Sequence, residues 1–408
     1  MIAYAEALAL LLAESGVLED EWCRSSDALS RVLAESVHAP RALPPFNNAA
    51  MDGYAFSSGG NVPTAGSEHE VAGLIVAGEP LPSDTTGKVW EITTGAPLPA
   101  GLDCIVPLER VERLPCGRIR LRDALSGGQN VRQRGSDIAM AKQMAMAGQR
   151  IDPALCMMFA ALGIERLKVR RKPRVVLLST GAELIADASL PLGEGQVYAA
   201  NAPYLQASLQ AMGAEVIASA TLGDDAQLFA ARLRQVAARA DLVLSTGAVS
   251  TGPHDFIPAC LQTTKARLLF HKAAIRPGKP LLAASLQDGP LFIGLPGNPI
   301  ATAVGFRFFV VPVLRAMLGM PPESPLRVAL SEPVHAVAGL RHFLKARLRQ
   351  TASSGIGLEL LEGQESYRIG PLLQANAWAV LHEDANELPA GTLVDVLPRD
   401  AGDGWRFD

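Results

Sequence analysis

The chain has 408 residues, which at about 150 residues per domain predicts roughly two to four domains. Apolar residues make up 49% and charged residues 19% of the sequence, which excludes a wholly disordered, collagen-like or coiled-coil protein. The 37 basic and 41 acidic residues give a net charge of −4, which argues against a generally basic surface for nucleic acid.

The five cysteines are scattered and show no C-x-x-C spacing, so neither a disulfide framework nor a cysteine zinc site is expected. Residues 1–13 are apolar at helical spacing but carry Glu6 and lack a basic stretch, and they predict a core helix rather than a signal peptide. No stretch reaches the roughly 18 uninterrupted apolar residues of a membrane helix. We therefore expect a cytoplasmic protein that binds neither nucleic acid nor a membrane.

The first part of the chain predicts a helical domain interrupted by a β domain. Up to about Pro40 the apolar positions recur every three or four residues, which favours helices, and a second helical stretch follows at 153–162. Between them, short β-rich runs alternate with proline and glycine. We predict a discontinuous helical scaffold and dimerisation domain at 1–43 and 139–170, and an inserted β domain at 44–138 with strands at 71–77, 88–93 and 118–121.

After Pro173 strand and helix patterns alternate, which is typical of a parallel α/β unit. The patterns predict strands at 174–179, 215–220, 242–245, 281–284 and 291–294, and helices at 204–212, 226–240 and from Pro299 onward. Short alternating segments return after Pro322. The predicted fold is therefore multidomain α/β plus β, with a central three-layer α/β domain at 171–320 and a C-terminal β-barrel-like domain at 321–408.

Three of the predicted strands end in glycine loops, namely 178–184, 244–252 and 294–299. The carboxyl ends of parallel strands line the ligand crevice of an α/β sheet, and glycines let backbone N–H groups approach an anion, so these loops favour a phosphorylated ligand. Asn298 is expected to cap a helix that begins with Pro299. The candidate phosphate-binding residues in the loops are Gly181, Gly247, Ser250, Gly252, Pro296, Gly297 and Asn298.

Charged residues accompany these loops. The cations Lys272, Arg276 and Lys279 surround a proline–glycine turn, which suits contact with phosphate oxygens, with a solvated surface loop as the alternative. Acids in loop positions suit Mg²⁺ together with substrate phosphates, although each acid alone also fits a helix cap or a surface charge. These acids are Glu183, Asp224, Asp225 and Asp255.

The ordered motifs are P-F-N-N-A-A-M-D-G-Y-A from Pro45, T-G-A-P-L-P from Thr94, R-G-S-D-I from Arg134, S-T-G-A-E-L from Ser179, G-A-V-S-T-G-P-H-D-F from Gly247, A-I-R-P-G-K-P from Ala274, G-L-P-G-N-P from Gly294 and G-P-L-L-Q-A-N-A from Gly370. In this combination the chain closely resembles the molybdopterin molybdenumtransferase family, which includes the gephyrin E domain. The resemblance spans nearly the whole chain.

The resemblance implies an enzyme of molybdenum cofactor biosynthesis that inserts molybdate into the dithiolene of adenylylated molybdopterin and releases AMP with a divalent cation, usually Mg²⁺. It implies a molybdopterin-binding-like central domain and a homodimer, whose cleft would join the α/β domain of one subunit to the β domain of the other. Molybdopterin adenylyltransferase and molybdoenzyme maturation proteins are the other expected partners. By motif position, catalytic roles fall to Asp52, Thr94, Asp137, Glu183, Asp224 and Asp255, with Asp224 and Asp255 as the leading metal ligands.

Four positions depart from the usual family pattern. The family usually has Asp where Asn47 stands, a second Gly at Ala248, an acid near Pro253 and often Lys at Arg276. The loss of the acid near Pro253 matters most, because proline offers neither charge nor a backbone donor. Two alternatives therefore stay open, a molybdopterin-binding scaffold paralogue that inserts metal poorly and a molybdopterin adenylyltransferase, although the long flanking domains oppose the latter.

Overall fold

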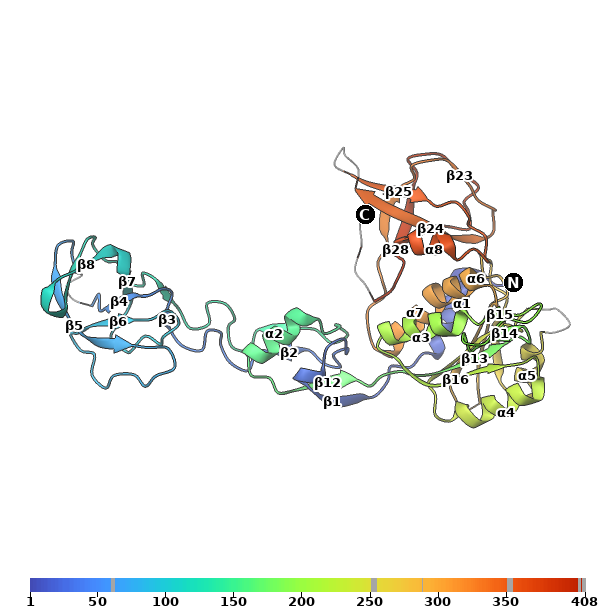
Figure 1. The fold of residues 1–408 in the computed structure, drawn as a ribbon, viewed down its shortest axis with the longest axis horizontal. Helices are drawn as coiled ribbons and strands as arrows, with labels where there is room; N and C mark the ends of the chain where they lie inside the picture. The colour runs from blue at the N-terminus through green and yellow to red at the C-terminus, as the bar shows by residue number, and fades with distance from the viewer. Residues whose placement is uncertain (60–62, 251–254, 288, 351–354, 403–404, 406–408) are drawn as a thin grey trace.

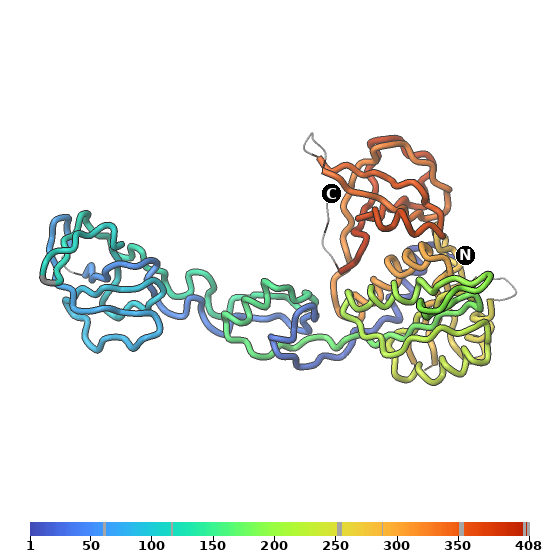
Figure 2. The backbone as a smooth tube through the Cα atoms, viewed as in Figure 1, coloured from blue at the N-terminus to red at the C-terminus, as the bar shows by residue number. Residues whose placement is uncertain are grey.

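The computed structural model describes residues 1–59, 63–250, 255–287, 289–350, 355–402 and 405. The molecule is elongated (Figure 1 and Figure 2): a β domain, a small middle domain and a larger α/β domain follow one another, and a C-terminal β domain lies against the α/β domain. The predicted multidomain α/β plus β fold is confirmed.

The α/β domain is built on a six-stranded sheet with the order β16-β13-β17-β21-β20-β18. Its strands are β13 (Arg174–Thr180), β16 (Glu215–Leu222), β17 (Leu242–Thr246), β18 (Arg267–His271), β20 (Leu282–Ser285) and β21 (Leu291–Leu295), with a small pair β14 (Leu184–Ile185) and β15 (Val197–Tyr198) outside it. β20 is antiparallel to both of its neighbours, so the expectation of a wholly parallel unit is wrong at this edge. The connection 286–290 is too short for the crossover that parallel strands require.

Alternate side chains of the central strands enter two cores, one on each face of the sheet. Val175 and Leu177 lie in the core that includes α3 and α6, whereas Val176 lies in the opposite core with α4 and α5. Burial on both faces explains why these strands are apolar at successive positions. The helices are α3 (Asn201–Ala211), α4 (Ala226–Ala237), α5 (Ile257–Thr263), α6 (Pro299–Gly305), the π-helical η4 (Phe306–Val310) and α7 (Val311–Met317).

The helix predicted at the start of the chain is present as α1 (Tyr4–Glu14). It lies against the α/β domain rather than within the middle domain, because Ala7 and Leu11 are fully buried in the same core as Leu314 of α7. The middle and β domains are therefore inserted in the chain between α1 and β13.

The helical run from Pro299 to Met317 is long and apolar enough, by length and composition, to cross a membrane. However, 83% of its most apolar window is buried inside the molecule. Arg307 interrupts the run, is 2% exposed, and pairs with Glu323 at 2.7 Å between Nη1 and Oε2. These features are those of the central core helix of a folded domain.

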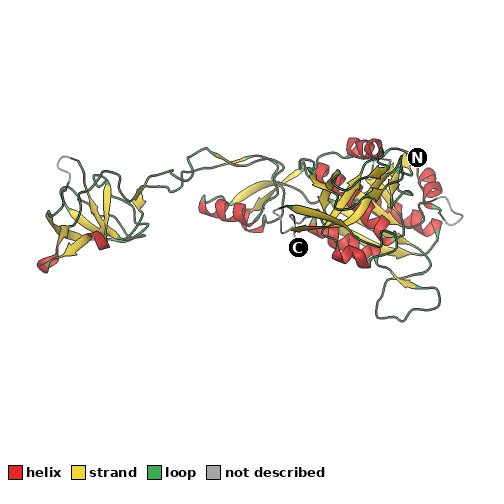
Figure 3. Ribbon diagram, turned by 90° about the horizontal axis from the view of Figure 1, so that it is seen from above, coloured by secondary structure: helices red, strands yellow, loops and turns green. Residues whose placement is uncertain are grey.

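The middle domain combines one helix with short strand pairs (Figure 3), and its helix confirms the one predicted at 153–162. The helical prediction for residues 15–40 is wrong. Leu33 is buried against Phe159, whereas Leu29 is 53% exposed, so their four-residue spacing does not define one helix face. The elements are α2 (Pro153–Ala161), η1 (Ser25–Asp27), and the antiparallel pairs β1 (Asp20–Arg24) with β12 (Arg166–Arg170) and β2 (Val37–His38) with β11 (Gln143–Ala145).

The β domain contains a six-stranded sheet with the order β7-β4-β6-β5-β9-β8. Its strands confirm those predicted at 71–77, 88–93 and 118–121. Gly53 is required where β4 passes β7, because a Cβ atom there would lie 2.0 Å from the Val106 carbonyl oxygen. The elements are β3 (Asn48–Ala49), β4 (Gly53–Phe56), β5 (Glu68–Ile75), β6 (Val89–Ile92), β7 (Cys104–Pro107), η2 (Leu108–Arg110), β8 (Val111–Arg113), η3 (Pro115–Gly117), β9 (Arg118–Leu121) and β10 (Val131–Arg132).

The C-terminal domain is a β sheet that captures one strand from the α/β domain. That strand, β19 (Ile275–Arg276), belongs to the predicted cationic segment and pairs in parallel with β24. The sheet order is β19-β24-β26-β28-β22, with β25 on β24. The elements are β22 (Leu326–Ala329), β23 (Val334–His335), β24 (Arg341–Gln350), β25 (Ile356–Leu360), α8 (Gly370–Gln374), β26 (Ala377–Leu381), β27 (Glu387–Leu388) and β28 (Leu393–Pro398).

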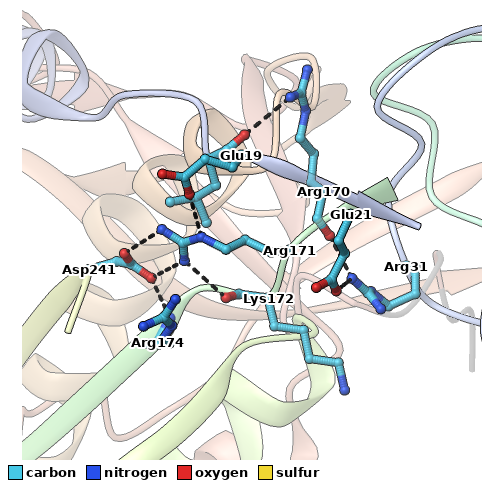
Figure 4. Close-up of polar contacts among 9 residues, drawn as sticks. Glu19, Glu21, Arg31, Arg170, Arg171, Lys172, Arg174 and Asp241 are labelled. Atoms are coloured by element: carbon cyan, nitrogen blue, oxygen red, sulfur yellow. Dashed lines mark hydrogen bonds and ion pairs between the residues drawn. The ribbon is translucent and has the colours of Figure 1, made fainter. Parts of the chain in front are cut away.

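An ionic cluster stands where the chain crosses between the middle and α/β domains (Figure 4). The Arg171 guanidinium donates to both carboxylate oxygens of Asp241, at 2.6 and 2.8 Å, and to Glu19 at 2.5 Å. The backbone N–H of Arg174 also donates to Asp241, at 2.7 Å. Both crossing segments are thereby tied to β17 through one arginine, because Glu19 lies on the outgoing segment and Arg171 on the returning one.

We expect Asp241→Asn to lower the free energy of unfolding by about 2 kcal/mol at pH 7, because it removes the charge but keeps an acceptor for Arg174. Burial raises the pKa of Asp241, but the bonds from Arg171 and Arg174 outweigh it, so that the net pKa is lowered. A carboxylate with a depressed folded-state pKa stabilises the protein above its unfolded pKa of about 3.9, and that contribution is lost as pH falls through the folded value. Urea unfolding should therefore show a deficit that shrinks below about pH 4, whereas the exposed Glu194→Gln should show none; an unchanged deficit would contradict this account.

Candidate functional site

A cavity of about 190 Å³ lies at the carboxyl ends of β13, β17 and β21. All three glycine loops contribute to it, which confirms the expectation that they meet at one edge of the sheet. The lining residues are Thr180, Gly181, Glu183, Leu184, Asn201, Asp224, Thr246, Gly247, Ala248, Asp255 and Gly297. We refer to it as the strand-end cavity.

Three of the predicted acids line the strand-end cavity. Glu183 and Asp224 are exposed, and Asp255 is half-buried. The neighbouring Asp225 instead caps α4, since its Oδ1 accepts from the N–H groups of Gln227 and Leu228 at 2.8 and 3.0 Å. Within the described part of the chain, no group of three or more acidic, histidine or cysteine side chains is placed to hold a metal ion.

The sequence did not single out three polar residues that shape this cavity, Thr180, Thr246 and Asn201. The Thr180 hydroxyl donates to the Thr246 carbonyl at 3.1 Å and joins the first two loops, and the Asn201 amide donates to the Gly297 carbonyl at 2.7 Å and holds the third. The repeated S-T-G-A at 179–182 and 245–248 was a signal for the threonines. Asn201 depends on how α3 packs and had no comparable signal.

The turn after β17 has a strained backbone at the cavity wall. Gly247 has φ +85°, and a Cβ atom there would lie 2.5 Å from the Thr180 carbonyl oxygen, so glycine is required. Ala248, one of the departures from the family pattern, also has a positive φ, of 52°. An L-residue in this conformation costs about 1–2 kcal/mol relative to the right-handed region. Gly252 and Pro253, which follow in the same loop, lie outside the described residues.

A larger cleft of about 910 Å³ separates the α/β domain from the C-terminal domain. We call it the interdomain cleft. The predicted residues Arg276, Lys279, Pro296 and Asn298 line it from the α/β side, and both basic residues are exposed. Facing residues of the C-terminal domain include His335, His342, Gln364, Glu365, Ser366 and Tyr367.

Asn298 stands at the start of α6, but its side chain makes no capping bond, so that part of the prediction is wrong. Its amide nitrogen donates instead to the Ser366 hydroxyl at 3.0 Å. The Ile300 N–H, which the helix leaves unpaired, donates to the Ser366 carbonyl at 2.9 Å. The C-terminal domain therefore supplies the cap, and the sequence gives no local signal of a partner so distant in the chain.

Two of the predicted phosphate-binding residues, Ser250 and Lys272, lie outside the lining of both the cavity and the cleft. Ser250 is half-buried at the end of its loop. Lys272 is also half-buried and has φ 74°; its backbone carbonyl accepts from the Ile2 N–H at 3.0 Å. The roles assigned to these two side chains stay predictions.

Asp52 and Thr94 adjoin β4 and β6 of the β domain, which lies at the far end of the elongated chain from the α/β domain (Figure 1). Asp137 lies where the β domain joins the middle domain, since the next residue, Ile138, packs against Leu162. The Asp52 carboxylate accepts from the backbone N–H of Thr94 at 2.6 Å and from the Thr94 hydroxyl at 2.8 Å, and these bonds lower the pKa of Asp52. Asp137 is exposed. Asn47, another departure, accepts from the Arg134 N–H at 2.8 Å and so joins the two motif loops. One chain alone does not bring these residues to the cavity.

Comparison with known proteins covers the chain from end to end. Residues 2–163 match the MoeA N-terminal region (domains I and II), residues 176–316 a probable molybdopterin binding domain, and residues 327–398 the MoeA C-terminal region (domain IV). The molybdopterin molybdenumtransferase of Synechococcus elongatus is 36% identical over 97% of this chain and 99% of its own length, and molybdopterin molybdenumtransferase 2 of Mycobacterium tuberculosis is 33% identical over 91% and 93%.

The structure agrees with these matches. The crystal structure of the molybdopterin biosynthesis MoeA protein from Pyrococcus horikoshii superposes with a TM-score of 0.82 at 26% identity, over 99% of this chain and all of that one. The match includes the domains that flank the central one, which opposes the adenylyltransferase. The relatives are named molybdenumtransferases, which favours the transferase over the scaffold paralogue. The chain therefore belongs to the molybdopterin molybdenumtransferase family and is a transferase of molybdenum cofactor biosynthesis.

Proposed function

We propose that the chain inserts molybdate into the dithiolene of adenylylated molybdopterin and releases AMP across the two hollows described above. The observation that carries this proposal is the loop 296–298, in which Gly297 lines the strand-end cavity whereas Pro296 and Asn298 line the interdomain cleft. A ligand held by its phosphates in the cavity would thus reach the cleft directly. The dithiolene supplies its own sulfurs, so no protein cysteine is required.

The strand-end cavity and the interdomain cleft would bind groups of different charge. Backbone at Gly181 and Gly247 allows close approach of the phosphates, while Arg276 and Lys279 offer positive charge to molybdate or phosphate oxygens in the cleft. Asp224 and Asp255 would hold Mg²⁺ or another divalent cation, whose shell phosphate oxygens and water would complete. That cation would supply charge neutralisation as the phosphoanhydride is cleaved.

We further propose a homodimer in which the β domain of one subunit completes the site of the other. Large apolar side chains stay exposed on the middle domain, with Met157 at 71%, and surfaces of this kind commonly mark interfaces. They are Trp22, Leu29, Met140, Met146 and Met157. Such a dimer would place Asp52, Thr94 and Asp137 beside a partner's cavity.

The proposed setting is the cytoplasm, where a molybdopterin adenylyltransferase would supply the substrate and molybdoenzyme maturation proteins would receive the product. The described cysteines, Cys23, Cys104, Cys156 and Cys260, are free thiols, which suits a reducing compartment. Fractionation of the source cells with detection of the protein would test this placement.

Replacing either proposed metal ligand should reduce molybdate-dependent AMP release. We expect Asp224→Asn or Asp255→Asn to lower kcat/KM at least about tenfold, and added Mg²⁺ to restore part of it, because a lost carboxylate weakens cation binding. Asp225→Asn is the matched control, since Asn caps helices as well as Asp does and Asp225 serves α4. AMP and pterin-bound molybdenum would be measured together; unchanged rates in both variants would remove the metal assignment.

A shared site should show complementation between inactive subunits. Dimers of Asp52→Asn and dimers of Asp255→Asn should each be deficient alone. When equal amounts are dissociated and re-associated together, about a quarter of the wild-type AMP release should return. Half of the new dimers contain one subunit of each kind, and each of these holds one intact site of its two. The readout is AMP release before and after exchange, with the mass measured by light scattering. A dimeric mixture without recovery would show that the two residues act within one subunit.

A further inference from the structure

Lys345 carries a positive charge that no solvent reaches. It lies on β24, is 0% exposed, and donates from Nζ to the carbonyl oxygens of Gly363 at 2.6 Å, Arg368 at 3.1 Å and Glu365 at 3.5 Å. An ammonium group has three donors, and three acceptors are placed around it. Burial lowers the pKa of Lys345, and the negative charge of Glu365 partly opposes that shift.

The acceptors of Lys345 all belong to one loop, 361–368, which a second residue fastens to the same point of β24. The Gln364 side-chain oxygen accepts from the Lys345 N–H at 2.9 Å, and its amide nitrogen donates to the Lys345 carbonyl at 2.8 Å and to the Leu361 carbonyl at 2.7 Å. The side chain and the backbone of Lys345, together with Gln364, thus hold the loop near its start, in its middle and at its end.

This loop forms the C-terminal wall of the interdomain cleft, to which it contributes Gly363, Gln364, Glu365, Ser366 and Tyr367. It also carries the Ser366 cap of α6, which binds Asn298 and the Ile300 N–H. A shift of the loop would therefore move the cleft wall and release the start of α6 at the same time.

We infer that Lys345 is a positioning residue for the interdomain cleft, acting through the 361–368 loop to set the distance between Ser366 and the cationic residues Arg276 and Lys279. The inference rests on the oxyanion role proposed for this cleft. Leu344 and Gln364 line the cleft, but Lys345 itself does not. The Lys345 ammonium group donates to backbone carbonyls instead. It therefore orders the site without touching the anion.

The test uses the full chain and three substitutions in the C-terminal domain. Lys345→Met removes the ammonium but keeps an unbranched side chain, and Gln364→Leu releases the loop while leaving the charge. Arg349→Met is the matched control, because it removes one positive charge from the same strand at an exposed position paired with Glu359. Each is compared with wild type by KM and kcat for molybdate in AMP release, and by amide hydrogen exchange.

We expect Lys345→Met and Gln364→Leu both to raise the KM for molybdate about tenfold or more, with kcat at saturating molybdate changed far less, because unpaired carbonyls loosen the loop without altering the reacting groups. Exchange should quicken in 361–368 and at the start of α6. Arg349→Met should change neither quantity. If Lys345→Met does not fold, Gln364→Leu must show both the raised KM and the faster exchange across 361–368, because Gln364 itself also lines the cleft.

Four results would overturn the inference. The first is faster hydrogen exchange of the 361–368 loop in Lys345→Met and Gln364→Leu with an unchanged KM for molybdate. The second is a raised KM in Lys345→Met but not in Gln364→Leu, which would indicate a direct effect of the lysine charge. The third concerns Lys279→Met, whose affinity for molybdate alone is measured by titration calorimetry. If this variant binds molybdate as tightly as wild type does, the cleft does not bind the oxyanion and Lys345 has no role in positioning it. A raised KM in Lys279→Met, with both loop variants normal, would leave the cleft assignment standing and remove Lys345 alone.

Discussion

The burial of β13 and β17 on both faces is the constraint on which the site depends. Their side chains alternate between two apolar cores, so neither strand has room for a ligand group along its buried length. Polar residues begin where the strands end, at the S-T-G-A loops, and parallel pairing brings those ends to one edge. The glycines then let the backbone itself form the wall of the strand-end cavity.

The loop 296–298 separates the acids of the strand-end cavity from the cations Arg276 and Lys279 of the interdomain cleft. Glu183 and Asp224 line the strand-end cavity, and Arg276 and Lys279 line the interdomain cleft. In one shared hollow such groups would pair with each other, and a ligand would have to displace those pairs before binding. In the proposed function, this separation would let the acids face a cation and the bases face an oxyanion. The Ser366 cap and the Asn201 bond fix the dividing loop from both sides.

The sequence predicted those parts of the structure whose signal is local. Apolar runs and turn residues predicted the central strands, α2 and α4, and they predicted that the glycine loops meet. The predictions failed where distant partners decide the outcome: Leu33 is buried by α2 rather than by a helix of its own, and Asn298 turns to Ser366 instead of capping α6. The interdomain cleft had no signal either, because its walls come from two domains. Nor does the sequence indicate that Lys345 is buried.

α1 is made long before the segments on which it docks. The Tyr4 hydroxyl donates to the Phe308 carbonyl at 3.1 Å, across 304 residues. At roughly 5–20 residues per second of synthesis, the apolar face of α1 would wait tens of seconds for its partners, while the inserted domains emerge and fold on their own. The large loop that must close before these contacts form also slows folding of the α/β domain. An aggregation risk during synthesis therefore lies in the exposed apolar face of α1, until the segments around Phe308 have been made.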